Sequence, residues 1–326
     1  MKKAKILSLL RQSDGYLSGQ ELCEQFGISR TAVWKLMNQL KEEGYEIEAV
    51  QNKGYRLVSS PDILSREEIL SRLHTQWIGQ HLVYKDRTGS TNLDAKRAAE
   101  EGAPEGTVIV TQYQESGRGR RGRSWASPDG CNVYFTLLLY PRCAPAQVSA
   151  VTLLMAVAVA EAVEELSLAA GIKWPNDIVI EGKKVCGILT EMSMERDYIH
   201  HIVIGTGINV NQAEFPKELR PTATSLALEK GEDVHRAALL SRILDLFEEI
   251  YTVFSHTWDL SALMERYESH LLNKGRDVRV LDPRGEWQGR ALGITRSGEL
   301  LVERTDGSVE EVYAGEVSVR GIYGYV

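Results

Sequence analysis

The chain has 326 residues, of which 43% are hydrophobic and 25% are charged, and its formal net charge at pH 7 is −7. This length predicts two or three domains of ordinary size, and an acidic balance excludes non-specific nucleic-acid affinity as a property of the whole chain. The charge is uneven, however. Residues 1–60 carry nine Lys and Arg against seven Asp and Glu, which is compatible with local contact between this segment and nucleic acid.

Cysteine usage and the apolar stretches place the protein inside the cell and away from membranes. The four cysteines are scattered, with no pair at metal-ligand spacing, so we expect reduced thiols in a cytoplasmic protein. The apolar run at 6–10 includes Ser8 and is too short for a signal peptide. The long apolar stretch at 148–163 contains Glu161 and is shorter than a bilayer span. We expect it to be a buried core helix.

Residues 1–60 are predicted to form a winged helix-turn-helix. The segment 4–11 has helical apolar spacing, a capping box at 18–21 begins a second helix, and Ser29 caps a third. Alternating apolar residues at 45–58 around a central Asn-Lys-Gly predict a hairpin that would serve as the wing. The side chains expected to meet base edges and phosphates are Ser29, Arg30, Thr31, Trp34 and Lys35, with Lys53 on the wing. The alternative is a helical packing module without a nucleic-acid role; the wing and the local charge favour DNA binding.

The fold class expected for the whole chain is α+β, in three parts. After a linker at 59–62, residues 65–270 alternate strands and helices as a mixed α/β domain, and residues 275–326 form a small β-barrel. The elements expected in the central part are helices at 65–73, 93–101 and 147–168, strands at 83–86, 107–113, 185–191 and 199–211, a strand pair at 171–180, a turn at 182–184, and helices within 236–270. The strands expected in the barrel are 277–281, 286–294, 299–303, 309–312 and 316–320.

The most informative motif is the segment 117–123, which places four arginines and three glycines within seven residues. Glycines let the backbone approach a ligand closely, and their N–H groups can form an anion-binding nest. Arginine adds forked donors suited to carboxylate and phosphate. Trp125 follows, placed to stack on a flat base. This pattern predicts a loop that binds a nucleotide and a second anion together.

The residues of this loop allow two other interpretations. Gly117, Gly119 and Gly122 satisfy the dinucleotide-binding fingerprint, but that motif must open a helix. The following residues, 124–130, include two Ser, a Pro and an Asp-Gly pair, which favour turns, so no helix begins there. A solvated basic loop is the other interpretation, and the glycine spacing weakens it.

Four motifs in order along the chain resemble a known family. They are Gly117–Arg123, Lys173-Trp-Pro-Asn-Asp177, Lys184 followed by Val-Cys-Gly-Ile, and Gly205-Thr-Gly-Ile-Asn209. With the three-part organisation, they make the full chain similar to the bifunctional biotin protein ligases that double as the biotin operon repressor. The resemblance implies a central domain of the biotin/lipoate-ligase type and a C-terminal barrel of the SH3-like kind.

The resemblance also implies an activity and partners. Biotin and ATP, with Mg²⁺, would give biotinyl-5′-AMP, and a lysine of the biotin carboxyl carrier protein would then attack this intermediate. The adenylate-bound protein would form a homodimer on operator DNA and repress biotin biosynthesis genes. We expect the loop 117–124 to be mobile without ligand and to order over the adenylate.

The same resemblance implies the roles of individual residues. Lys184 would contact the reacting carboxyl group, Arg118 would lie in the biotin and phosphate loop, and Asp177 is a candidate base for the transfer step. Residues expected to bind biotin are Ser90, Thr91, Asn92, Gln114, Arg118, Gly119, Arg120 and Lys184. Residues expected to bind ATP or the adenylate are Arg120, Arg121, Trp125, Asn176 and Asn209. No metal cage made by protein alone is expected; Mg²⁺ would enter with ATP, near Asp177.

Plainer interpretations stay open for several of these residues. Ser90 to Asn92 precede a predicted helix and suit simple capping, Lys184 suits a turn, and Trp125 suits a half-buried rim position. For the whole protein, three alternatives remain. The first is a biotin-sensing transcription factor without ligase activity, the second a lipoate ligase, and the third a biotin ligase whose winged helix no longer binds DNA.

Overall fold

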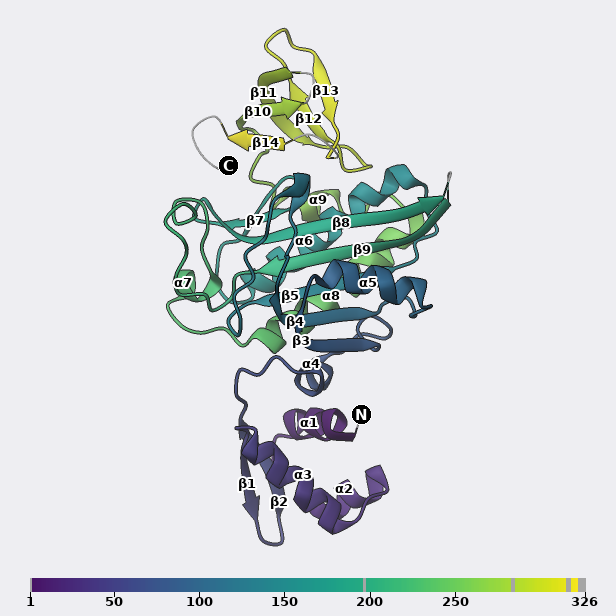
Figure 1. The fold of residues 1–326 in the computed structure, drawn as a ribbon, viewed down its shortest axis with the longest axis vertical. Coiled ribbons are helices and arrows are strands. Elements are labelled where there is room, and N and C mark those ends of the chain that lie inside the picture. The colour runs from purple at the N-terminus through teal and green to yellow at the C-terminus, as the bar shows by residue number, and fades with distance from the viewer. Residues whose placement is uncertain (1, 196–197, 283–284, 315–317, 322–326) are drawn as a thin grey trace. The chain divides into compact units, whose positions relative to one another are not determined.

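The computed structural model describes residues 2–195, 198–282, 285–314 and 318–321 (Figure 1). The chain divides into two compact units. The first comprises residues 1–74 together with 235–241, and the second comprises residues 75–234 together with 242–326.

The first unit contains the predicted winged helix-turn-helix, which the structure confirms. Its elements are α1 (Lys2–Gln12), α2 (Gly19–Phe26), α3 (Arg30–Glu42), the antiparallel strands β1 (Glu46–Val50) and β2 (Gly54–Ser59), and α4 (Arg66–Arg72). Ser18 and Glu21 form the capping box: Ser18 Oγ accepts the Glu21 N–H at 3.0 Å, and the Glu21 carboxylate accepts the Ser18 N–H at 2.8 Å. Ser29 Oγ likewise accepts the Ala32 N–H at 3.2 Å at the start of α3. Because these bonds satisfy N–H groups without helical partners, local chemistry sets where both helices begin.

A buried carboxylate joins elements within the first unit. Glu68 on α4 is fully buried, and it accepts Arg11 Nη2 at 2.6 and 2.8 Å, Arg72 Nε at 2.8 Å and the Tyr45 hydroxyl at 2.6 Å. His235 Nε2 lies 3.4 Å from the same carboxylate. A buried charge is tolerated only when it is paired and hydrogen-bonded, so α1, α4 and the start of β1 are tied to one another at this point.

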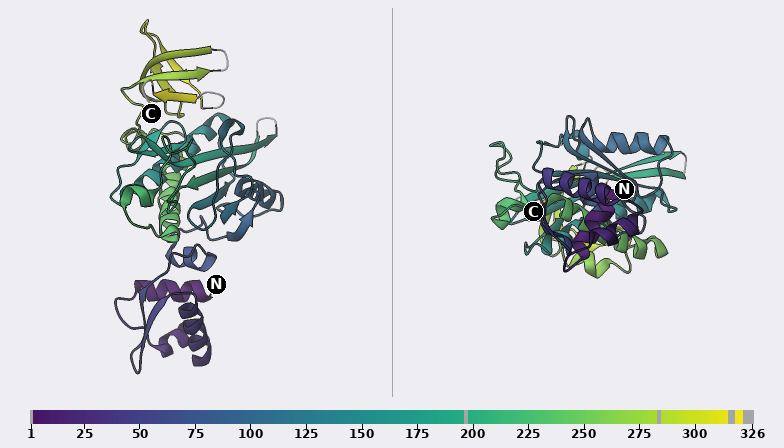
Figure 2. Two further views of the ribbon diagram at one scale, coloured as in Figure 1. Left: turned by 60° about the vertical axis from the view of Figure 1, so that its left-hand side comes forward. Right: turned by 90° about the horizontal axis from the view of Figure 1, so that it is seen from below.

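The second unit is built on a seven-stranded sheet with the order β3-β4-β5-β9-β8-β7-β6 (Figures 1 and 2). Its strands are β3 (Leu82–Thr88), β4 (Val108–Gln114), β5 (Val133–Leu139), β6 (Gly171–Lys173), β7 (Asp177–Ile180), β8 (Lys183–Glu195) and β9 (Tyr198–Ile208). β3 and β4 are parallel, and the other neighbours are antiparallel.

Helices cover both faces of this sheet. The helices that follow β3 along the chain are α5 (Thr91–Glu100), α6 (Val148–Glu164), α7 (Leu226–Lys230), α8 (Arg236–Thr257), which begins in the first unit, and α9 (Met264–Glu268), with single 3-10 turns at Arg120–Gly122 and Pro145–Gln147. On β8, Glu191 contacts Lys96 of α5 while its neighbour Thr190 contacts Thr152 of α6. Successive strand residues point to opposite faces, so α5 and α6 lie on opposite sides of the sheet.

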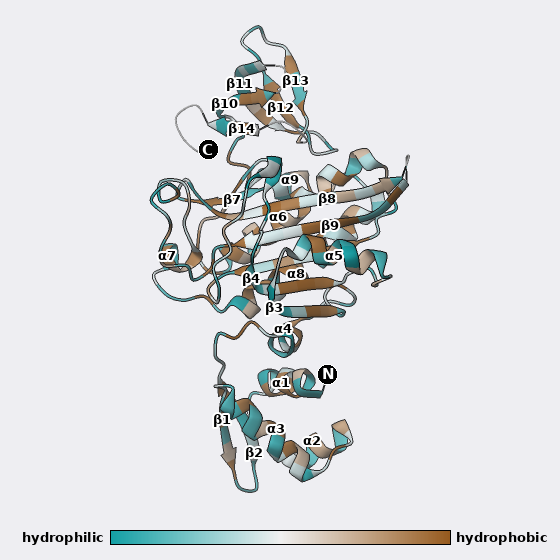
Figure 3. Ribbon diagram, in the orientation of Figure 1, coloured by the Kyte–Doolittle hydropathy of each residue, from teal (hydrophilic) through white to brown (hydrophobic). Residues whose placement is uncertain are grey.

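The α6 helix is the hydrophobic centre of this unit. Residues 145–164 are helical, long enough and apolar enough to cross a membrane. However, 72% of the most apolar part of this segment is buried inside the protein. The sequence predicted this helix to be a core element, and its burial agrees with that. In Figure 3, much of the α5 ribbon is coloured hydrophilic, whereas β4 is largely coloured hydrophobic.

The C-terminal strands form a second sheet with the order β13-β12-β11-β10-β14 (Figure 2). Its members are β10 (Asp277–Asp282), β11 (Gly285–Ile294), β12 (Leu300–Glu303), β13 (Val309–Val312) and β14 (Ser318–Gly321). The predicted five short strands are therefore present. The first two residues of the last predicted strand, Glu316 and Val317, lie outside the described residues.

One local prediction was wrong. The segment 182–184 was expected to be a turn, but β8 already begins at Lys183, which pairs with Ile180. Glu181 and Gly182 both have positive φ, at 48° and 75°. Two such residues complete a tight hairpin turn by themselves, so Lys184 sits on a strand rather than on a loop.

Candidate active site

A pocket of about 300 Å³ lies on the face of the sheet that carries α5. Its floor consists of glycines on β8 and β9, where Gly187 pairs with Gly207 and Leu189 pairs with Gly205. A Cβ atom at Gly205 would lie 2.0 Å from Asn92 Oδ1, and one at Gly207 would lie 2.6 Å from Trp125 Nε1. The floor thus needs glycine, because flat side chains lie directly on the strands.

The arginine-rich loop closes over one side of this floor and is tied to itself. Gly119 N–H donates to Arg123 O at 2.7 Å, and Trp125 N–H donates to Gly117 O at 2.8 Å. A Cβ atom at Gly117 would lie only 2.5 Å from Trp125 O. A single 3-10 turn at 120–122 takes the place of the helix that a dinucleotide-binding fingerprint requires. The prediction that this loop is not a dinucleotide-binding fingerprint is therefore confirmed.

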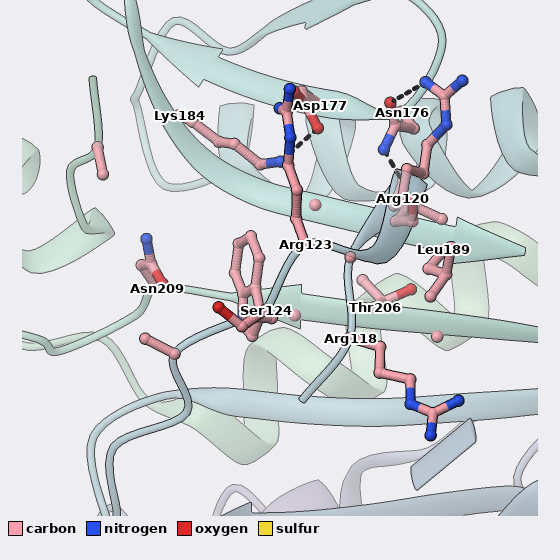
Figure 4. A pocket seen from close by; sticks show the side chains of 18 of the residues that line it. Arg118, Arg120, Arg123, Ser124, Asn176, Asp177, Lys184, Leu189, Thr206 and Asn209 are labelled. Atoms are coloured by element: carbon pink, nitrogen blue, oxygen red, sulfur yellow. Dashed lines mark hydrogen bonds and ion pairs between the residues drawn. The ribbon is translucent and has the colours of Figure 1, made fainter. Parts of the chain in front are cut away.

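Lys184 and Asp177 form the ion pair at the centre of the pocket. Lys184 Nζ lies 2.5 Å from Asp177 Oδ1 (Figure 4). Their strands are neighbours, and a bulge at Val185 shifts the register so that Lys184 pairs with Val179 while Cys186 pairs with Ile178. Bulges re-aim side chains next to active sites. In Figure 4 the guanidinium of Arg123 points toward this pair, and that of Arg118 points away from it.

Arg120 and Asn176 form a second polar group in the pocket. Arg120 Nη1 donates to Asn176 Oδ1 at 3.1 Å, and Arg120 Nη2 donates to the carbonyl of Ala314. Asn176 Nδ2 donates to Ile188 O at 2.9 Å. Burial lowers the pKa of the Arg120 guanidinium, and Asp177 acts against that effect. These hydrogen bonds orient the guanidinium in the pocket, and an oriented cation suits the stabilisation of an anion.

Lys173 also lines the pocket. It begins the motif Lys173-Trp-Pro-Asn-Asp177, but no role was predicted for it from the sequence. Its side chain ends β6 and is 5% exposed. Burial lowers the pKa of Lys173 to about 8, Asp177 acts against this, and Lys184, Arg320 and Arg123 add to it. Its place four residues before Asp177 was the available signal, since both belong to one motif. Strong pKa shifts in a cleft mark candidate functional groups.

The expected biotin-binding residues at the start of α5 do come together. Ser90, Thr91, Asn92 and Gln114 all line the pocket. The N–H of Thr91 and its hydroxyl group donate to Gln114 Oε1 at 3.0 and 3.1 Å. Ser90 occupies the cap position of α5, but its side chain makes no capping hydrogen bond. Simple capping therefore does not account for Ser90, although Ser65 on α4 does cap in that way.

Trp125 and Asn209 occupy the side of the pocket expected to bind the nucleotide. Lys184 Nζ lies 5.1 Å from the centre of the Trp125 ring, and Trp125 Nε1 is buried without a hydrogen-bond partner in the described part of the chain. The side-chain amide of Asn209 donates to Thr224 O at 3.0 Å, so it supports the chain around the pocket as well as lining it.

Two groups of residues that line the pocket were not predicted from the sequence. One is the segment between β9 and α7, which contributes Gln212, Phe215, Pro216, Leu219, Thr222 and Ala223. Its carbonyl at Thr222 accepts the Lys184 N–H at 2.8 Å. The other is the pair Val319 and Arg320 on β14. Neither carries a motif, because only the tertiary fold brings these segments to the site.

The residues expected to contact DNA lie in the first unit. Trp34 on α3 is 56% exposed, and Thr31 and Lys35 beside it are also exposed. Arg30 Nη2 donates to Gln20 Oε1 at 3.0 Å. Lys53 is exposed on the hairpin turn, with its Nζ 5.6 Å from the centre of the Tyr16 ring. The N-terminal side of α3 and the wing thus present the cationic side chains that DNA recognition uses.

No cluster of three His, Cys, Asp or Glu side chains that could hold a metal ion occurs within residues 2–195, 198–282, 285–314 and 318–321. In the pocket, Asp177 supplies one carboxylate. Magnesium is commonly bound through one or two carboxylates together with substrate phosphates and water, and this donor set fits that mode.

Comparisons with known proteins agree with this arrangement. Residues 84–209 match the Biotin/lipoate A/B protein ligase family, residues 2–56 match an HTH domain, and residues 275–320 match the Biotin protein ligase C terminal domain. A solved structure, the biotin protein ligase from Aquifex aeolicus in complex with biotin and ATP, is 32% identical, with a TM-score of 0.65. The match covers 74% of this chain and 99% of that chain. The central fold and its pocket therefore define a ligase of this class.

Full-length relatives add the N-terminal domain. The bifunctional ligase/repressor BirA of Bacillus subtilis (strain 168) is 41% identical, over 98% of this chain and 98% of that protein. The protein of the same name in Escherichia coli (strain K12) is 29% identical, over 97% of this chain and 96% of that protein. The chain belongs to the family of bifunctional biotin protein ligases and repressors.

Proposed function

We propose that this protein joins biotin to a carrier protein and represses biotin biosynthesis genes in response to biotin. Residues 1–60 would bind DNA, residues 65–270 would catalyse ligation, and residues 275–326 would form the accessory barrel, all in the cytoplasm. The observation that carries the proposal is the pocket itself. It combines a flat glycine floor, a self-closed arginine loop and the cations Lys173 and Lys184 around one carboxylate, Asp177.

The first step joins two anions. A carboxylate oxygen of biotin attacks the α-phosphorus of ATP, the bond to the bridging oxygen breaks, and pyrophosphate leaves. Two unit charges about 4 Å apart repel by roughly 4 kcal/mol at an effective dielectric near 20, which costs about three powers of ten in rate. Preplaced cations remove this repulsion. Lys184, on a flexible stem, would follow the carboxylate into the mixed anhydride, and Arg118, Arg120 and Arg121 would hold the phosphates.

The second step transfers biotin to the biotin carboxyl carrier protein. The amine of an acceptor lysine attacks the biotinyl carbonyl carbon, the carbon–oxygen bond to the phosphate breaks, and AMP leaves. The amine must lose a proton. Asp177 is the carboxylate among the described residues that line the pocket, and its partner Lys184 is 2.5 Å away. We infer that Asp177 accepts this proton once Lys184 has moved to the ligand.

Several residues would hold the ligands without taking part in bond changes. Ser90, Thr91, Gln114 and Gly119 would surround the fused ring of biotin, whose urea needs both donors and acceptors. Trp125 would stack on adenine, with Asn176 and Asn209 near the phosphates and ribose. Mg²⁺ would enter with ATP, held by phosphate oxygens and the Asp177 carboxylate, and would neutralise charge on the phosphates.

Ligand binding would be coupled to DNA binding through assembly. We infer that the adenylate-bound protein forms a homodimer whose two winged helices meet symmetric half-sites of an operator. Ser29, Arg30, Thr31, Trp34, Lys35 and Lys53 would contact that DNA. The support for this is the exposure of these side chains on α3 and the wing, together with the full-length similarity to proteins named ligase/repressor.

The ligase part is tested by substitution of Lys184. Purified protein would be assayed for pyrophosphate release with ATP and biotin, and for transfer of biotin to a carrier domain, with lipoate as a competitor. K184M is expected to lower the rate of adenylate formation by about 100- to 1,000-fold, because it removes a preplaced cation. The neighbouring K183M, whose side chain does not line the pocket, serves as the control. Turnover of lipoate instead of biotin, or normal turnover by K184M, would contradict the proposal.

A further inference from the structure

A row of hydrogen bonds runs from the outer surface of α5 to the biotin-binding side of the pocket. At its outer end, Lys96 Nζ donates to Glu191 Oε1 at 2.7 Å. The other oxygen of this carboxylate, Oε2, accepts Asn92 Nδ2 at 2.7 Å. Asn92 lines the pocket, whereas Glu191 and Lys96 do not. Glu191 can therefore affect a ligand only through its neighbours.

The side-chain amide of Asn92 can point only one way. Its Nδ2 group faces two oxygens that cannot donate, the Glu191 carboxylate and the carbonyl of Leu189 at 3.3 Å. Its Oδ1 atom therefore faces inward, 2.7 Å from Thr136 Oγ1. An amide oxygen only accepts, so the single hydroxyl hydrogen of Thr136 is directed to Asn92. Gly205 leaves the space for this amide, since a Cβ there would lie 2.0 Å from Asn92 Oδ1.

The direction of this hydrogen bond determines what Thr91 presents to a ligand. Thr136 Oγ1 also lies 2.8 Å from Thr91 Oγ1, but its hydrogen is already used. Gln114 turns its Oε1 toward Thr91, because it accepts the Thr91 N–H at 3.0 Å. The Thr91 hydroxyl hydrogen goes to Gln114 Oε1 at 3.1 Å, and neither Gln114 Oε1 nor Thr136 gives a hydrogen back. Both lone pairs of Thr91 Oγ1 are therefore left as acceptors at a buried pocket surface.

We propose that Glu191, braced by Lys96, is a positioning residue that makes Thr91 Oγ1 a hydrogen-bond acceptor for a ureido N–H of biotin. The proposal rests on the proposed function as a biotin ligase. Without the Glu191 carboxylate, Asn92 Nδ2 keeps only its longer hydrogen bond to Leu189 O at 3.3 Å, and the amide can more readily rotate by half a turn and place Nδ2 against Thr136. Thr136 then donates to Thr91 and occupies one of the two lone pairs of its oxygen, so Thr91 Oγ1 is a weaker acceptor for the urea.

The surroundings of Glu191 suit this role. Burial raises the pKa of the Glu191 carboxyl, but hydrogen bonds from Lys96 and Asn92 and the charges of Lys96 and Arg118 outweigh it, so the pKa lies below its ordinary value. The group is thus an anion that cannot donate a hydrogen to Asn92. Thr91, Asn92 and Thr136 are all nearly or fully buried, so water competes little for the hydrogen bonds between them.

The test uses full-length protein and two cyclic carbamate analogues of biotin, each with one ureido N–H replaced by a ring oxygen. Dissociation constants would be measured by calorimetry for biotin and for both analogues. With wild-type protein, one analogue is expected to bind about 10- to 100-fold more weakly than biotin, because it leaves a buried acceptor without a donor. In E191A this penalty should shrink to about threefold or less, while biotin itself binds about tenfold more weakly. E191Q keeps an oxygen for the Asn92 amide and should retain most of the penalty.

A kinetic measurement separates this role from a general structural one. In E191A the KM for biotin in pyrophosphate release should rise about tenfold while kcat changes by less than about threefold, since Glu191 does not touch the reacting carboxyl group. The matched control is E161A, which removes a similarly half-buried carboxylate held by Arg266 at 2.5 Å outside the pocket. It should leave the analogue penalty unchanged. Thermal unfolding would verify that both variants are folded.

The outcomes distinguish the inference from the proposed function. If wild-type protein binds biotin and E191A keeps the full analogue penalty, the positioning role of Glu191 is wrong and the ligase assignment stands. If wild-type protein does not bind biotin, both are wrong. Should E191A fail to fold, K96M tests the row from its outer end. It should reduce the analogue penalty by about two- to fivefold, and an unchanged penalty in K96M would overturn the proposal.

Discussion

Lys173 has a pKa near the pH at which enzymes are usually assayed. Its burial holds the pKa at about 8, so the side chain is an ammonium below that pH and a neutral amine above it. An ammonium near Asp177 and Lys184 would help to hold the ATP phosphates. The neutral amine would not, because it has no charge that attracts the phosphates.

The catalytic consequence is a loss of activity on the alkaline side. The value of kcat/KM for ATP reports the free enzyme, so it should fall as pH rises through about 8. In K173R the cation persists because arginine stays charged, and the fall should move beyond pH 9.5 or so. K173M should be about 10- to 100-fold slower at pH 7 and should lack this limb. Pyrophosphate release measured from pH 6.5 to about 9.5 tests this. An identical alkaline limb in wild type and K173R would refute the assignment to Lys173.

At the scale of single elements, the arginine loop depends on a glycine that touches its own chain. Gly117 lies where a Cβ would be 2.5 Å from Trp125 O and 2.8 Å from Ser127 Oγ. Ser127 also accepts Gln114 Nε2 at 3.0 Å. An added methyl group would therefore disturb the arginines of the loop, Trp125 and, through Ser127, Gln114 together.

G117A is expected to lower kcat/KM for adenylate formation by about tenfold or more, since misplaced catalytic groups lose rate steeply. Its melting temperature should stay close to that of wild type, because the loop lies outside the hydrophobic core. G89A is the matched control: a Cβ there would meet only Ser116 Oγ at 3.7 Å. Activity of G117A equal to that of G89A would show that the loop tolerates the methyl group and that its packing is unimportant.

Glu68 gives a corresponding prediction for the first unit. E68A removes the buried carboxylate that pairs with Arg11 and Arg72. Removing one partner of a buried ion pair typically lowers the free energy of unfolding by about 3–5 kcal/mol. We expect operator binding to be lost and denaturant unfolding of residues 1–74 to occur at lower concentration. Adenylate formation should persist, because none of these residues lines the pocket. E67A removes the adjacent, half-buried glutamate and should behave as wild type. Normal operator affinity in E68A would contradict this account of the buried carboxylate.

The same elements show what could be predicted from sequence. Ser18, Glu21 and Ser29 announced their helices because a cap uses neighbours a few residues apart, and the pocket motifs were found because each is contiguous. Lys173 was quoted without a role, since its burial comes from the fold. The contribution of Glu191 depends on Asn92 and Thr136, which lie far away in sequence. The lining from 212–223 and from Arg320 has no motif, so only the tertiary structure reveals it.

The whole molecule combines a ligase and a DNA-binding unit in one chain. The central domain supplies a pocket built for adenylate formation, and the N-terminal unit exposes Arg30, Thr31, Trp34 and Lys35 on α3. Under the proposed function, the adenylate formed in the pocket would be the signal for the DNA-binding unit. Coupling between sites requires that the adenylate favour the DNA-binding state, which we assign to the homodimer.

A double substitution separates the two functions. R30A/K35A removes two cations from the exposed side of α3 and should weaken operator binding by about 100-fold or more. Transfer of biotin to a carrier domain should continue at the wild-type rate, because neither side chain lines the pocket. Unchanged operator binding by this variant would exclude α3 as the recognition helix.

The measurement that tests the central claim most directly is a gel shift with the promoter region of the biotin biosynthesis genes. The full-length protein would be used without ligand, with biotin alone, and with biotin and Mg-ATP, while carrier labelling is followed in parallel. The account predicts a strong shift only when the adenylate can form. A shift of equal strength without ligands, or no shift beside normal carrier labelling, would contradict the claim that one chain is both ligase and biotin-responsive repressor.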